Sequence, residues 1–186
     1  MTTMPHTAAA AHQTESVVAA IRRHHGELAR GVAQRVNAVL DAVDMLSPGV
    51  EGARAELVRY CEQELLPHAA AEEDSLYRAG AELTASELLV AAMTAEHVAL
   101  RALVDEIANA TSSARLAAAA GGLRSLFEAH LAKENDSLLP ALVAAGVNLE
   151  TVICDLHHLL GHEEGEPSAV ESRSETGCGC GSCDCA

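Results

Sequence analysis

Aromatic side chains are scarce in this sequence. It has no tryptophan, two tyrosines and one phenylalanine among 186 residues. The alternating β-branched and aromatic residues typical of strands are missing, whereas alanine and leucine, which favour helices, are frequent. Because 49% of the residues are hydrophobic, the chain can bury one sizeable core. We therefore expect an all-α protein.

Positive charge and long apolar runs are also scarce. Lys and Arg number 12 against 27 Asp and Glu, which gives a formal net charge of −15 at pH 7. This charge opposes generic binding to nucleic acid and to anionic membranes. No apolar run approaches the roughly 18 residues of a membrane-spanning helix, and the N-terminus lacks the basic-then-apolar order of a signal peptide. We expect a cytosolic protein whose natural electrostatic partner is a cation.

Cysteine is nearly absent outside the C-terminal end. Cys61 and Cys154 lie far apart in helical patterns, where single buried thiols behave as small hydrophobes. The other cysteines follow the pattern C-x-C-x-x-C-x-C and are Cys178, Cys180, Cys183 and Cys185. They could hold a second, soft metal ion as thiolates or form a labile redox disulfide. A reactive tail without function explains them as well.

An internal repeat organises the chain. HAAAEEDSLY at residues 68–77 recurs as HLAKENDSLL at residues 130–139. The segments before them also match, since residues 15–32 and 87–104 share the spacing of Glu, Val, His and Leu. Each half therefore offers a lone His followed by a His-x-x-x-Glu pair, which indicates an internal duplication.

Turn signals divide the chain into helices. They lie at Ser47-Pro48-Gly49, at Ala79-Gly80 and at residues 109–113. Four helices joined by short loops predict an antiparallel up-and-down four-helix bundle. Thr14 or Ser16 would cap the first helix, and residues 84–87 (TASE) read as a capping box for the third.

The predicted organisation has four parts. We expect a flexible lead over residues 1–13, the bundle over 14–146, a short docking helix over 147–161 and a disordered, acidic, Cys-rich tail over 162–186. Within the second helix, Pro67 should kink or restart the helix, because proline removes a backbone hydrogen bond.

Helical spacing places the repeated His and Glu residues on the apolar faces of the bundle. The candidate metal ligands are His25, His68, Glu72, His97, His130 and Glu134. Unpaired, such groups would cost several kcal/mol of desolvation each, and no Lys or Arg shares their faces. Either the Glu residues stay protonated or cations bind between them.

Four nitrogens and two carboxylates overfill a tetrahedral zinc site. They suit two metal ions that share bridging carboxylates, with two His ligands and an exchangeable position each. A solvent-derived oxygen, oxo or hydroxo, completes such pairs. We expect two iron ions, with manganese as the alternative.

This ligand order resembles the hemerythrin-like (HHE cation-binding) domain over about residues 14–145. The resemblance implies a non-haem di-iron centre in a four-helix bundle, with the four His residues as terminal ligands and Glu72 and Glu134 as bridges. The chain departs from the oxygen-carrying hemerythrins, because Arg101 stands where their third helix supplies a second His. It is closer to relatives associated with sensing of iron, nitric oxide or peroxide and with iron supply.

Three functions compete at this point. The first is a di-iron protein that binds or responds to O2, NO or peroxide, and the second is a protein for iron storage, delivery or sensing that captures metal with its Cys tail. The third is an acidic helical interaction module without metal. No nucleophile–base motif, phosphate loop or cofactor fingerprint is present, so any enzymatic activity would come from the metals. Glu73, Glu96 and His24 adjoin the ligands and could orient an imidazole or remain solvated.

Overall fold

The structure, a computed structural model, describes residues 6–152, and these are all helical apart from the turns that connect the helices. The all-α prediction is confirmed. The elements are α1 (His6–Asp44), α2 (Val50–Tyr60), the π-helical segment η1 (Cys61–Leu65), α3 (Leu66–Asp74), α4 (Leu76–Ala81), α5 (Glu87–Ala108), α6 (Ser113–Lys133), the π-helical segment η2 (Glu134–Leu138) and α7 (Leu139–Ala144).

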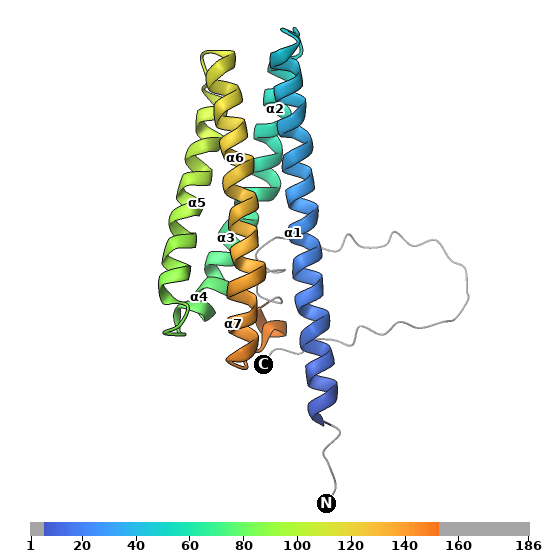
Figure 1. Ribbon diagram of the computed structural model, residues 1–186, viewed down its shortest axis with the longest axis vertical. Coiled ribbons are helices and arrows are strands. Elements are labelled where there is room, and N and C mark those ends of the chain that lie inside the picture. Colours follow the sequence, from blue (N-terminus) through green and yellow to red (C-terminus); the bar gives the residue numbers. More distant parts are fainter. Residues whose placement is uncertain (1–5, 153–186) are drawn as a thin grey trace, which may run out of the picture.

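These elements form four long segments, because α2 to α4 follow one another with little interruption, as do α6 to α7. Figure 1 shows the segments side by side, with successive ones running in opposite directions. Helix α1 contacts α2 and α6, and α5 contacts α2, α4 and α6. None of the helices described over residues 6–152 is both long and apolar enough to cross a lipid bilayer.

The helix starts differ in part from the prediction. Helix α1 begins at His6 rather than at Thr14 or Ser16, so the predicted flexible lead over residues 1–13 is wrong from His6 onward. The reason is composition, because the alanines in this stretch have the highest helix propensity of any residue. The predicted capping box is also wrong: α5 begins at Glu87 with Ser86 as its N-cap, and the Ser86 side chain makes no capping hydrogen bond.

The C-terminal end of the described region closes with a glycine turn. Gly146 has φ of 73°, and Gly146 N and Val147 N donate to the carbonyls of Val143 and Leu142. This is a Schellman motif, which closes α7. Asn148 Oδ1 then accepts from Glu150 N and opens a further helical turn that starts at Leu149. The remainder of the predicted fifth helix and the Cys tail, including Cys178, Cys180, Cys183 and Cys185, lie outside the described residues.

Two prolines shape the second and fourth segments. Pro67 and Pro140 each lie in the first turn of an α-helix, directly after the π-helical segments η1 and η2. A proline lacks an N–H and its ring crowds the preceding turn, and the wider π turn relieves this crowding. The expected interruption at Pro67 therefore takes the form of a π segment. The equivalent residues Glu72 and Glu134 therefore lie in different kinds of helix. Glu72 lies in the α-helix α3, after η1, whereas Glu134 is the first residue of the π-helical segment η2.

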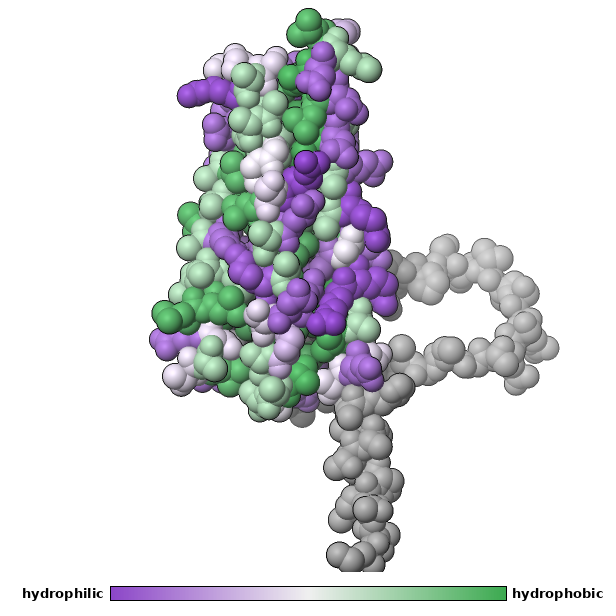
Figure 2. Space-filling model, viewed as in Figure 1, coloured by the Kyte–Doolittle hydropathy of each residue, from purple (hydrophilic) through white to green (hydrophobic). Residues whose placement is uncertain are grey.

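The apolar core consists of two clusters. One contains Leu28, Leu65, Leu100 and Phe127 among others. The other contains Ile21, Leu76, Met93 and Leu138 among others. In each long segment a candidate His ligand lies between a residue of one cluster and a residue of the other, as His25 does between Ile21 and Leu28. The polar residues therefore form a layer between two apolar clusters. Figure 2 shows hydrophilic and apolar residues interspersed over one outer face.

Gly80 tests how tightly the second cluster is packed. A Cβ atom at Gly80 would lie 2.8 Å from Leu138 Cδ1 and 2.9 Å from Val90 Cγ2. Gly80→Ala should therefore destabilise the protein by about 1–3 kcal/mol through overpacking, measured by urea unfolding. Gly121→Ala is the matched control, because nothing lies within 4 Å of its added Cβ, and it should stabilise α6 by up to about 1 kcal/mol. Equal effects of the two substitutions would contradict this packing.

Candidate metal centre

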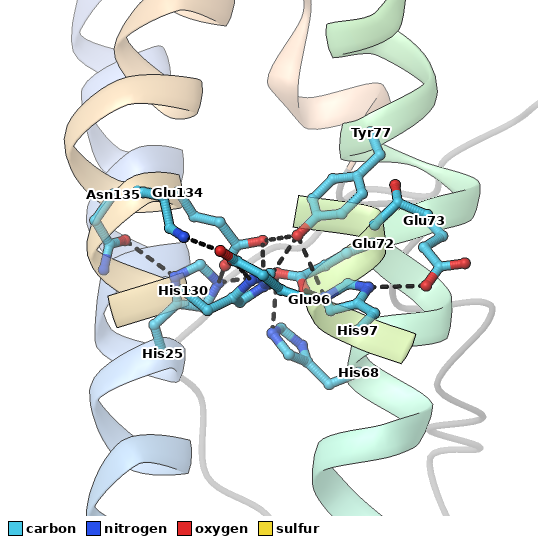
Figure 3. Close-up of polar contacts among 12 residues, drawn as sticks. His25, His68, Glu72, Glu73, Tyr77, Glu96, His97, His130, Glu134 and Asn135 are labelled. Atoms are coloured by element: carbon cyan, nitrogen blue, oxygen red, sulfur yellow. Dashed lines mark hydrogen bonds and ion pairs between the residues drawn. The ribbon is translucent and has the colours of Figure 1, made fainter. Parts of the chain in front are cut away.

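The six predicted ligands converge in the polar layer. They come from α1 (His25), α3 (His68 and Glu72), α5 (His97), α6 (His130) and the first position of η2 (Glu134). Each is at most 2% exposed. Figure 3 shows their side chains pointing toward one another between the helices. The structure thus brings together every residue that the repeat singled out.

The ligand atoms form two groups that share Glu72. His25, His68 and Glu72 make one group, and Glu72, His97, His130 and Glu134 make the other, with donor atoms of each group within 4.8 Å of one another. Glu72 Oε1 lies 3.0 Å from His68 Nε2 and 3.2 Å from His25 Nε2, while Glu72 Oε2 lies 3.8 Å from His97 Nε2. One carboxylate therefore faces both groups.

Glu134 faces both groups as well. Its Oε1 lies 3.4 Å from His130 Nε2, and its Oε2 lies 3.7 Å from His25 Nε2. The two carboxylates stand where two cations could share them, each cation with two imidazole nitrogens. This is the donor set that suits a pair of iron or manganese ions.

Charges within the layer compensate one another in part. Burial alone would raise the pKa of Glu72, but the imidazoles of His68 and His25 hold it well below its usual range. Burial would lower the pKa of His25, yet the hydrogen bond and charge of Glu72 raise it. The pKa of His130 is raised against burial by Glu134. Glu72 and His25 thus each favour the charged form of the other.

Some buried polar atoms of this layer lack a hydrogen bond. Among the described residues they are His68 Nδ1, Glu134 Oε2 and His68 Nε2, the last of which has only its ion-pair contact with Glu72 Oε1 at 3.0 Å. All three belong to the candidate ligands. Buried polar groups are almost always paired in native proteins, so their concentration among these six side chains fits donor atoms of a metal site. The residues present fit a pair of metal ions.

A layer of residues behind the imidazoles fixes their orientation. His97 Nδ1 donates to Glu73 Oε1 at 2.8 Å, and His130 Nδ1 donates to Glu96 Oε2 at 2.9 Å. Of the two roles that the sequence left open for Glu73 and Glu96, the structure shows that both hydrogen-bond an imidazole. With Nδ1 protonated in this way, the Nε2 lone pair of each ring can face a cation.

The imidazoles of His25 and His68 have no carboxylate hydrogen-bonded to Nδ1 among the described residues. His25 Nδ1 donates to Asn135 Oδ1 at 3.0 Å, while the half-buried His24 packs edge-on against His68, with ring centroids 4.9 Å apart. Burial and the neighbouring His68 and His25 lower the pKa of His24 to about 4. His24 is therefore neutral near pH 7.

Tyr77 is a site residue that the sequence analysis missed. Its hydroxyl donates to Glu134 Oε1 at 2.6 Å, and its oxygen lies 3.0 Å from His130 Nε2 and 3.3 Å from His97 Nε2. Burial and the charges of Glu134 and Glu72 raise the pKa of Tyr77 above its ordinary value. The repeat contained one indication of this role, because a polar aromatic residue, Tyr77, stands where the second copy has the apolar Leu139.

A surface hollow of about 820 Å³ lies between the start of α1 and α7, with Val18, Arg22, Leu139 and Asn148 among its lining residues. None of the six candidate ligands lines it. Within residues 6–152, the groups of side chains that could hold a metal ion lie in the interior layer.

An all-helical fold around a buried His and Glu cluster defines a class, the helical metal-binding proteins. A family model described as "Hemerythrin HHE cation binding domain" matches residues 16–142. No curated protein and no solved structure matches the chain. The chain belongs to the hemerythrin HHE cation-binding family, as the resemblance predicted.

Removing the Tyr77 hydroxyl should weaken the metal-free protein. Tyr77→Phe takes from Glu134 its donor at Oε1, and a hydrogen bond to a charged group contributes about 1.5–3 kcal/mol. We expect a loss of that size in urea unfolding of the metal-free protein. Tyr60→Phe is the control, since the Tyr60 ring stacks under the Arg35 guanidinium at 3.9 Å, away from the cluster. Unchanged stability of Tyr77→Phe would refute the role given to this hydroxyl.

Proposed function

We propose that this chain forms the antiparallel four-helix bundle of its family, holds two iron ions in the polar layer, and binds or responds to O2, NO or peroxide. The sharing of Glu72 and Glu134 by two groups of imidazoles carries this proposal. His25 and His68 would hold one ion, and His97 and His130 the other. The predicted cytosolic location stays a prediction.

The two iron ions would be redox-active and would offer an exchangeable coordination position to a small ligand. Burial of the layer favours a small ligand, because each of the six side chains is at most 2% exposed. A diatomic molecule or peroxide needs less room than an organic substrate. The function is therefore better described as ligand binding or sensing than as conversion of an organic substrate.

The residues of the chain prepare the layer for this role. Glu73 and Glu96 hold the Nδ1 protons of His97 and His130, so that both Nε2 atoms face inward. Tyr77 keeps a proton on its hydroxyl next to Glu134. This proton could pass to a ligand that accumulates negative charge.

Storage, delivery or sensing of iron is the alternative function. It uses the same six ligands, and it adds capture of metal by the four tail cysteines. A deletion of residues 177–186 separates the two proposals. Unchanged metal content and transfer rate in this variant would leave the tail without a role in metal handling.

Iron binding should stabilise the folded chain. Iron at about 100 times its dissociation constant would raise the free energy of unfolding by about 2.7 kcal/mol, and a chelator should reverse this. Glu72→Gln removes a charge that both groups share, so it should lower iron content from two ions per chain and abolish most of the stabilisation. Glu64→Gln, at an exposed position, is the control. The measurements are elemental analysis and thermal unfolding.

Two results would overturn the proposal. If chelation leaves thermal stability untouched, the chain is an interaction module rather than a metal protein. If the iron-loaded protein shows no change in its optical spectrum with NO or with peroxide, it binds iron but not these ligands. The proposal requires stabilisation by iron and a spectral response.

A further inference from the structure

The residues behind the two halves of the centre differ in charge. On one half both supporting partners are carboxylates: Glu73 behind His97 and Glu96 behind His130. Each carboxylate is itself held by a cation, since Arg101 donates to Glu73 at 3.0 Å and Lys133 donates to Glu96. Hydrogen bonds from these cations keep both carboxylates in place.

The other half has no acidic support. The partner of His25 Nδ1 is the neutral side-chain amide oxygen of Asn135. Arg22 donates to the backbone carbonyl of Asn135 at 2.7 Å. His68 Nδ1 lacks a hydrogen-bond partner among the described residues, and its ring packs against His24 instead. This half therefore has an amide and an imidazole where the first has two carboxylates.

The internal repeat shows that these are equivalent positions. In the alignment of residues 68–77 with 130–139, Glu73 corresponds to Asn135. In the alignment of residues 15–32 with 87–104, Glu96 corresponds to His24. The two copies keep their metal-ligating residues and differ in the residues behind them. The duplication has thus produced two ligand sets with unequal support.

A carboxylate behind a ligating imidazole increases the basicity of the ligand, and losing such a partner typically lowers metal affinity 10- to 100-fold. Glu72 and Glu134 face both halves, so they do not create the difference.

We propose that the two metal positions are unequal: the His97/His130 position binds its ion first and retains it, and the His25/His68 position exchanges its ion. Arg101, Lys133, Glu73 and Glu96 are positioning residues for the tight site. This inference rests on the proposed function. It predicts a stable half-loaded protein.

The test is a competition titration of the metal-free full chain with Co2+ against a chromophoric chelator. The four tail cysteines are replaced by serine, so that thiolates do not compete. We expect two steps whose dissociation constants differ by about 10- to 100-fold or more. The visible spectrum of bound Co2+ reports the coordination of each step.

Matched variants assign the steps. Glu73→Gln and Glu96→Gln should each weaken the first step about 10- to 100-fold and leave the second unchanged. Asn135→Asp should tighten the second step, a gain that misfolding cannot produce. At equivalent positions of the repeat, His97→Ala should abolish the tight step and His25→Ala the weak one.

Three outcomes would overturn the inference. They are two steps of equal affinity in the parent protein, equal weakening of both steps by Glu73→Gln, and an unchanged second step in Asn135→Asp. If the proposed function holds, Co2+ still binds at two ions per chain in these cases. No binding of any ion would instead refute the proposed function, and the inference with it.

Discussion

Burial of two carboxylates in the middle of a helical protein is the constraint on which this structure depends. Glu72 and Glu134 lie between two apolar clusters and are at most 1% exposed, where an unpaired charge costs several kcal/mol. Four imidazoles surround them, and the neighbouring Glu72 and Glu134 raise the pKa values of His25 and His130. The fold thus requires positive charge beside these two carboxylates.

Much of this arrangement was predictable from the repeat. The spacing of His25, His68, Glu72, His97, His130 and Glu134 required only the regular geometry of helices, because residues four apart lie on one face. The turn after α1 and the glycine that ends α7 followed from local turn chemistry. These features depend on residues that are close together in the sequence, so they can be predicted from one sequence.

Other parts depend on contacts between helices, which spacing does not reveal. Tyr77 reaches His130 and Glu134 from a different segment, and the bond between His25 and Asn135 joins α1 to η2. The π segments before Pro67 and Pro140 shift the helical phase locally, so a regular pattern could not place them. The early start of α1 at His6 shows alanine propensity extending a helix past a good capping residue.

The charges of the residues behind the imidazoles make the two halves of the centre unequal. Both halves present the same kind of ligands to the interior, while carboxylates support His97 and His130 and neutral groups support His25 and His68. Under the proposal of two bound ions, such a difference would let the protein keep one ion and exchange the other. The difference lies in residues outside the six candidate ligands.

The measurement that tests the central claim most directly is X-ray absorption of the iron-loaded protein, combined with its iron content. The account predicts two ions per chain, nitrogen and oxygen neighbours, and a second iron at about 3.5–4 Å. A single ion per chain, or two ions without an iron neighbour at that distance, would contradict it.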